Sequence, residues 1–248
     1  MPLAAAAALV GASIQSATGF GFALILSPAL FAAVDPVEAV SSLLVLGLAL
    51  NLLVLFEGGR PEHVDWRALS PMLVAALPGL AAGAAALTLL SKETLQVAVG
   101  IAVILAAGWQ LAQRVARESS EPARRVPPAA GWAAGFVSGA LTTSISVSGP
   151  PIVLWLEAHG VRPEEFRASL AASFLMLNLV GAAVVFVAEG SGALEADVVL
   201  PLLGLVLVGY ALGAVAFNRL EGDRFFALAL ALVACTGAAS LAAGLGLL

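Results

Sequence analysis

SVSGPPIVLWLEAHGVRPEEFRASLAASFLMLN, residues 146–178, carries the plan of the whole chain, because an earlier stretch repeats it. The earlier stretch is TGFGFALILSPALFAAVDPVEAVSSLLVLGLALN, residues 18–51. Each begins with hydroxyl and glycine residues, continues as an apolar segment, turns at a proline and ends at an asparagine inside another apolar run. This shared order predicts two related halves.

The match extends beyond these stretches. A shift of 127 positions aligns the two stretches, and a shift of 130 positions aligns the segments that follow them. The aligned pairs are Pro36 and Pro163, Glu38 and Glu165, Ser42 and Ser169, Leu43 and Leu170, Asn51 and Asn178, Pro71 and Pro201, Gly79 and Gly209, Gly83 and Gly213, and Leu90 and Leu220. Weak internal symmetry of this kind is typical of transporter folds. We therefore expect a first membrane repeat over 1–112, a cytoplasmic arginine-rich linker over 113–128 and a second membrane repeat over 129–248.

Composition indicates that the chain lies in a membrane. Hydrophobic residues make up 61% of it and charged residues 11%, against about 25% charged residues in soluble domains. A helix needs about 20 apolar residues to cross a bilayer. The runs that approach this length are Val37–Phe56, Leu69–Leu90, Thr94–Leu111, Phe166–Ala188, Val198–Phe217 and Phe225–Leu248. The predicted fold class is thus all-α, a polytopic integral membrane protein.

The positions of lysine and arginine predict the orientation, because cytoplasmic loops are enriched in these residues. If residues 129–157 cross once, the eleven Lys and Arg residues divide six inside to five outside. If residues 129–157 enter and return to the same side, ten lie inside and Lys92 alone lies outside. The second arrangement fits better, and symmetry extends it to residues 1–33.

Each half then consists of a broken helical hairpin followed by three transmembrane helices. An odd number of spans per half makes the repeats inverted. Residues 2–16 and 22–33 are each short for a span at 1.5 Å per residue. The alternative, two full tilted spans in place of each hairpin, preserves the same inversion.

The two breaks are the candidate functional sites. They lie in SIQSATGFGFALILSP, residues 13–28, and in TTSISVSGPP, residues 142–151. Broken backbone at membrane depth is tolerated only where it is buried in protein or lines a wet cavity. The substrate-binding residues we expect are Gln15, Ser16, Thr18, Gly19 and Gly21 from the first break, and Thr143, Ser146, Ser148, Gly149 and Pro150 from the second.

A helix that starts after each break would present free N–H groups and the positive end of its dipole. Two such ends make an anion site without a buried arginine. Arg167, one or two turns into its run, is either a cytoplasmic anion recruiter or an interface anchor. Asn51 and Asn178 are secondary candidates. For each single hydroxyl, a hydrogen bond to its own or a neighbouring helix is the competing interpretation.

The two G-x-x-x-G pairs, Gly79 with Gly83 and Gly209 with Gly213, predict close helix packing between halves or between protomers. Their glycine faces are compatible with a homodimer. We expect no nucleic acid partner, because the lipid bilayer is the solvent of this chain.

Acidic and basic residues are missing from the centres of the apolar runs, which disfavours a proton relay and a cation site. His63 and His159 fall in predicted cytoplasmic loops, and the single cysteine, Cys235, allows no metal cluster. We therefore expect no metal, no cofactor and no enzyme activity, since an intramembrane hydrolase would need a base at membrane depth.

With its G-F-G at 19–21, S-G-P-P at 148–151, R-A-S at 167–169 and duplicated order, the chain resembles the TauE/SafE sulfite exporter family, the TSUP permeases, over essentially its whole length. It departs from many members at the first break, where GFGFA replaces a run of three glycines. The resemblance implies a multi-pass permease of the bacterial inner membrane that moves sulfite, sulfoacetate or a similar organosulfonate, usually outward.

The expected function is thus export of a small sulfur-containing oxyanion by alternating access. The alternatives are a permease for another small anionic or neutral metabolite, and a non-transporting membrane anchor or assembly subunit. The duplicated breaks argue against the anchor, which has no need of them.

The orientation is testable by cysteine labelling in a Cys235→Ala background. A single cysteine placed within 189–197 is expected to react with a membrane-impermeant maleimide from outside. A cysteine within 157–163 is expected to react only after the membrane is opened. The reverse pattern would contradict the charge-based orientation.

Overall fold

The computed structural model describes residues 1–57, 64–117, 127–159, 161, 163–190, 194–217 and 234–247, and helices dominate all of the longer ranges. The helices are α1 (Pro2–Thr18), α2 (Phe22–Ala33), α3 (Pro36–Glu57), α4 (Trp66–Leu89), α5 (Lys92–Arg117), α6 (Pro128–Ile145), α7 (Gly149–Ala158), α8 (Pro163–Glu189) and α9 (Ala196–Phe217). Residues 234–244 are helical as well.

Five helices, α3, α4, α5, α8 and α9, are long and apolar enough to cross a bilayer. The predicted all-α, polytopic membrane class is therefore confirmed, whereas the inverted relation of the halves stays a prediction. Several residues used to predict the orientation, Arg60, Arg124, Arg125, Arg162, Arg219 and Arg224, lie outside the described residues, as do His63 and most of the linker.

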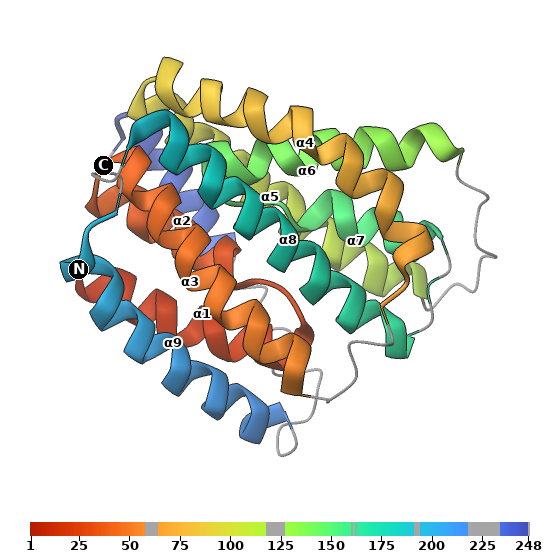
Figure 1. Cartoon of the computed structure of the whole chain (residues 1–248). Coiled ribbons are helices and arrows are strands. Elements are labelled where there is room, and N and C mark those ends of the chain that lie inside the picture. Colours follow the sequence, from red (N-terminus) through yellow and green to blue (C-terminus); the bar gives the residue numbers. More distant parts are fainter. Residues whose placement is uncertain are drawn as a thin grey trace.

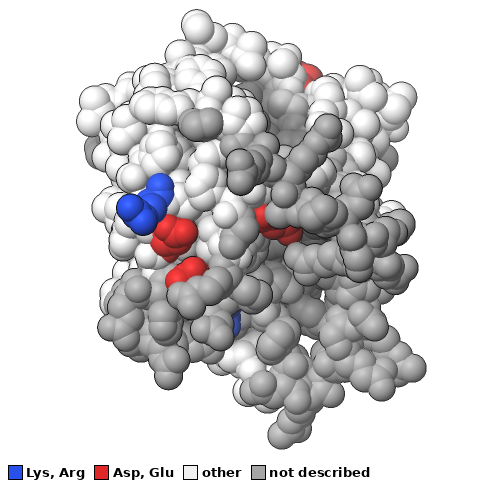
Figure 2. All heavy atoms as spheres, turned by 90° about the vertical axis from the view of Figure 1, so that its right-hand side faces the viewer, with Lys and Arg blue, Asp and Glu red and all other residues white. Residues whose placement is uncertain are grey.

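The helices run between two ends of the bundle (Figure 1). At one end, called the A end, the turn before α3 meets the start of α5, where Lys92 Nζ donates to Val34 O at 2.8 Å. At the other, called the B end, the start of α4 meets α8, where Asp65 N donates to Ser169 Oγ at 3.0 Å. Both chain termini lie near the A end in Figure 1. Figure 2 views the side at the right of Figure 1, where charged groups form a few patches among uncharged residues.

The short helices α2 and α7 start in the interior and run to opposite ends. α2 has 12 residues, about 18 Å at 1.5 Å per residue, and ends at the A end. α7 has 10 residues, about 15 Å, and ends at the B end. Each is too short for a hydrocarbon core of about 30 Å. These lengths favour re-entrant hairpins over paired spans.

Glycine contacts hold the two halves together. Gly79 and Gly83 of α4 lie against the backbone carbonyls of Phe136 and Ala140 of α6. The corresponding pair in α9, Gly209 and Gly213, lies against Leu9 O and Ser13 O of α1. In the alignment of the two predicted halves, α9 corresponds to α4 and α6 corresponds to α1. Each of the helices α4 and α9 therefore packs against the first hairpin helix of the other predicted half. In a bilayer, such close backbone approach gives the packing that apolar side chains alone do not.

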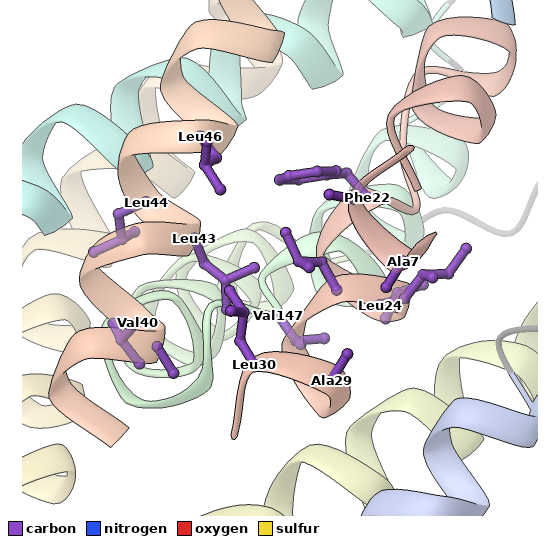
Figure 3. Packing of buried hydrophobic residues seen from close by; sticks show 14 of the residues in the cluster. Ala7, Phe22, Leu24, Ala29, Leu30, Val40, Leu43, Leu44, Leu46 and Val147 are labelled. Carbon is purple, nitrogen blue, oxygen red and sulfur yellow. The ribbon is translucent and has the colours of Figure 1, made fainter. Parts of the chain in front are cut away.

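Apolar packing fixes the first break against the second. One core cluster joins α1, α2, α3, α5 and α9 with residues at the end of α6, and a second joins α4, α7 and α8. Figure 3 shows Leu24 and Leu30 of α2, Leu43 of α3 and Val147 of the second break within the first cluster. The first cluster therefore includes residues next to both breaks.

Replacing Gly209 by leucine is expected to lower the free energy of unfolding by at least about 1–3 kcal/mol, because the side chain would collide with α1 backbone. Gly204→Leu on the same helix is the matched control, since nothing lies within 4 Å of its added Cβ. Thermal unfolding in detergent measures both variants. Equal melting temperatures would contradict the inter-half role of Gly209.

Candidate functional site

The two breaks meet at one small cavity of about 40 Å³. A site that holds one water needs about 10–15 Å³ measured in the same way, so this cavity accommodates roughly three. Its lining comes from both halves: Gln15, Phe20, Gly21, Phe22, Ala23, Leu24, Leu43, Gly47, Asn51, Ser146, Val147, Ser148, Gly149, Phe174 and Asn178. The lining therefore includes seven of the thirteen sequence-predicted site residues, and six, namely Ser16, Thr18, Gly19, Thr143, Pro150 and Arg167, lie outside it.

Glycine conformations make the first break. Gly19 ends α1 with φ of 89° and Gly21 precedes α2 with φ of 119°. Residues that carry a side chain rarely adopt such positive φ values. Thr18 Oγ1 lies 2.9 Å from Ile14 O and 2.7 Å from Phe20 O, so its hydroxyl hydrogen-bonds to backbone carbonyls of the first break. For Thr18, the structure supports the local hydrogen-bond interpretation.

Gln15 stabilises the start of α2, where Gly21 offers no side chain. Its Oε1 accepts from Phe22 N at 3.1 Å, and its Nε2 donates to Asn51 Oδ1 at 2.8 Å. Asn51 Nδ2 in turn donates to Gly47 O at 2.7 Å. Because a backbone N–H can only donate and a carbonyl can only accept, these ends fix the direction of the whole chain of hydrogen bonds. Both polar groups of the Gln15 amide are thus engaged within the protein.

The start of α2 still presents amide donors to the cavity. Ala23 and Leu24 occupy the first turn, where N–H groups have no intrahelical acceptor, and both line the cavity. The start of α7 differs, because Pro150 and Pro151 have no N–H to offer. These two prolines occupy the first turn of the helix. Its donors at the cavity are the Gly149 amide and the Ser148 hydroxyl.

Ser148 is 6% exposed, lines the cavity and makes no side-chain hydrogen bond to any described residue. A buried hydroxyl normally has a partner. Since α2 and α7 leave the cavity toward opposite ends, two positive helix ends face it together with this free hydroxyl. The arrangement is suited to an acceptor-rich, negatively charged solute.

The second break ends α6 at Ser146, whose φ is 58°. Ser146 Oγ lies 3.5 Å from Val40 O, a marginal hydrogen bond, and the residue lines the cavity. Ser27 Oγ of α2 donates to Ile145 O at 2.9 Å and joins the two breaks directly. Thr143 Oγ1 donates to Leu80 O at 2.7 Å, so this hydroxyl fastens α6 to α4.

Arg167 lies against the first break. Its Nη2 donates to Ser16 O at 2.6 Å, and its aliphatic part would be 3.2 Å from a Cβ added at Gly19. A cation in this place stabilises the negative end of the α1 dipole. The guanidinium thus interacts with the helix end next to the cavity, and Arg167 is not among the cavity-lining residues. Ser16 Oγ is buried and has no partner among the described groups.

Several cavity residues were not expected from the sequence. Phe20, Phe22 and Phe174 provide apolar rings, and Gly47 lies so close to Asn178 that an added Cβ would be 2.5 Å from its Nδ2. The one sequence feature that could have identified Gly47 as a cavity residue is its position one helical turn before Asn51. Its importance depends on a contact between halves, which spacing does not reveal.

None of the residues that line the cavity is an Asp, Glu, His, Lys or Arg. The described part of the chain contains no group of three His, Cys, Asp or Glu that fits a metal ion. His159 stacks on Trp155 at the B end, with ring centroids 4.4 Å apart. General acid–base chemistry thus has no titratable group on the cavity wall.

Comparison with known proteins gives two matches. The family described as sulfite exporter TauE/SafE matches residues 3–240. A protein of Cupriavidus necator described as a probable sulfite/organosulfonate exporter TauE is 32% identical over 189 residues, which cover 73% of this chain and 70% of that protein. No solved structure matches the chain.

Replacing Arg167 by glutamine is expected to lower the free energy of unfolding by about 1.5–3 kcal/mol, the usual contribution of a hydrogen bond to a charged group. Arg67→Gln, an exposed arginine at the same end of the bundle, is the control and should change it by less than about 0.5 kcal/mol. Thermal unfolding in detergent compares them. Unchanged stability with a weakened apparent substrate affinity would instead favour the recruiter interpretation of Arg167.

Proposed function

Since the chain belongs to the sulfite exporter TauE/SafE family, we propose that it is a membrane permease that exports a small sulfur-containing oxyanion. Sulfite and compact organosulfonates are the proposed substrates. The single observation that carries this assignment is the cavity at which the starts of α2 and α7 face each other without a charged side chain. Its donors are backbone amides and hydroxyls, which oxyanions accept well.

The chemistry of the cavity supports reversible binding. A fixed cation next to a desolvated anion gains strongly from the low dielectric of the interior, which opposes release. Neutral donors stabilise the anion by directed hydrogen bonds and dipoles, and they retain their orientation when it leaves. The cavity of about 40 Å³ favours a solute with few heavy atoms in this conformation.

Transport then requires that the cavity open alternately toward the A end and the B end. We propose that residues 1–112 and 129–248 act as inverted halves that rock against each other around the two breaks. The reciprocal contacts of α4 with α6 and of α9 with α1 would guide that motion. The A end faces outward and the B end faces the cytoplasm in this proposal, with the protein in a bacterial inner membrane.

Purified protein in sealed liposomes is expected to release trapped sulfite faster than liposomes without protein, and to leave a neutral solute of similar size inside. Sulfoacetate, tested in parallel, shows how far the cavity accepts an organic substituent. The release of each solute is measured against time. A folded preparation that moves none of the anions would overturn the proposal, and selective release of the neutral solute would favour a permease for neutral metabolites.

Ala23→Pro tests the amide donors in the same assay. It removes one N–H from the first turn of α2, where proline is tolerated, and proline already stands at the aligned Pro150. We expect anion affinity to fall by about tenfold or more, because a charge-assisted hydrogen bond is lost. Ala23→Gly keeps the N–H and is the matched control; equal flux through both variants would contradict a direct role for this amide.

A further inference from the structure

We propose that Asn178 is the side chain that recognises the anion, and that its aligned counterpart Asn51 is a positioning residue. The inference rests on the proposed transport of an oxyanion. Both asparagines line the cavity and occupy the same position of the repeat. Their hydrogen bonds, however, differ completely, and this difference assigns the two roles.

Both amide atoms of Asn51 form a hydrogen bond with a residue of the first half. The residue is 2% exposed, its Oδ1 accepts from Gln15 and its Nδ2 donates to Gly47 O. Through Gln15 the chain of hydrogen bonds continues to Phe22 N at the start of α2. Asn51 therefore fixes the helix end that offers Ala23 and Leu24 to the solute, and one N–H of its amide is already committed to Gly47 O.

The second half lacks this chain. A shift of 127 positions aligns Gln15 with Thr142, whose Oγ1 donates to Ser138 O of its own helix at 2.6 Å. The same shift aligns Gly47 with Phe174. Asn178 consequently makes no side-chain hydrogen bond to any residue that the structure describes, although it lies on the cavity wall.

Gly47 gives Asn178 its place. The Asn178 Nδ2 occupies space that a Cβ at position 47 would fill, so its amide lies close to the α3 backbone, and both Asn178 and Ser148 line the cavity. An amide with unused donors at a cavity is available to a ligand oxygen. Asn178 and Ser148 are then the side-chain donors from the second half, opposite the backbone amides of α2.

This assignment also bears on the size of the substrate. The rings of Phe174, one helical turn before Asn178, and of Phe20 lie near Gly149 on the cavity wall, and Phe22 also lines the cavity. A solute that reaches Asn178, Ser148 and the α2 amides together has its oxygens on a single small centre. We therefore infer that inorganic sulfite is bound in preference to an organosulfonate, whose organic substituent would meet these rings.

The equivalent asparagines provide a matched pair of variants. In sulfite-loaded liposomes, Asn178→Ala is expected to raise the half-saturation concentration about tenfold or more, with an unchanged melting temperature. Asn51→Ala is expected to lower the melting temperature and the maximal flux, and to raise the half-saturation concentration clearly less than Asn178→Ala does. Equal effects of the two substitutions on half-saturation would overturn the division of roles.

Gly47→Ala provides a second variant that keeps the Asn178 amide but displaces it. Alanine in a helix interior is favoured over glycine by about 1 kcal/mol, so folding should not suffer from the change in helix propensity. The expected result is a raised half-saturation concentration for sulfite. A wild-type value in both Asn178→Ala and Gly47→Ala would contradict recognition by Asn178.

The same measurements separate this inference from the proposed function. Absence of anion flux in the wild-type protein would remove the function itself, whereas wild-type flux with insensitive variants would remove only the role of Asn178. Competition between sulfite and sulfoacetate in the wild-type protein tests the substrate preference. If sulfoacetate inhibited sulfite flux more strongly than sulfite inhibits sulfoacetate flux at equal concentration, the preference for sulfite would be contradicted.

Discussion

A backbone N–H group that loses its partner inside a membrane costs several kcal/mol, and this penalty governs both breaks of the chain. Each interruption creates a new helix start with amides that lack acceptors. The two halves avoid the cost of unpaired amides in different ways. In the first, the Gln15 side chain accepts from Phe22 N. In the second, Pro150 and Pro151 have no N–H, so two of the donors are absent and the Gly149 amide remains. What remains is a small set of donors grouped around one cavity.

Those donors are useful only if the breaks stay together, and the packing of small residues ensures this. The glycine pairs of α4 and α9 let α4 contact the backbone of α6 and α9 contact the backbone of α1, so these contacts cross between the two predicted halves. Ser27 Oγ adds a direct hydrogen bond between α2 and the end of α6. A change at either interface would therefore reach the cavity through the helices that end there.

The sequence was sufficient for the helical class and the two breaks, because these follow from hydropathy, glycine and proline alone. It was not sufficient for the partners of individual polar groups. Gln15, Thr18 and Thr143 were all predicted to bind the substrate; each forms a hydrogen bond with a protein group, and of the three Gln15 lines the cavity. The direction in which an amide or hydroxyl donates depends on neighbours from other helices, and a repeat pattern contains no such information. For the same reason, Gly47 was not identified, because its role arises from contact with Asn178 of the other half.

The remaining asymmetry concerns electrostatics at the helix ends. α1 and α6 both end next to the cavity, and the negative end of a helix dipole disfavours an anion. At α1 this effect is opposed by Arg167, whose guanidinium donates to Ser16 O. At α6 the aligned position is Val40, and Ile145 O receives only the neutral hydroxyl of Ser27. The first break therefore has both the more favourable potential and the larger number of free amides, whereas the second contributes directed side-chain donors. An anion held between them gains its electrostatic stabilisation mainly from the first half and its side-chain recognition from the second, so a relative movement of the halves weakens both contributions at once.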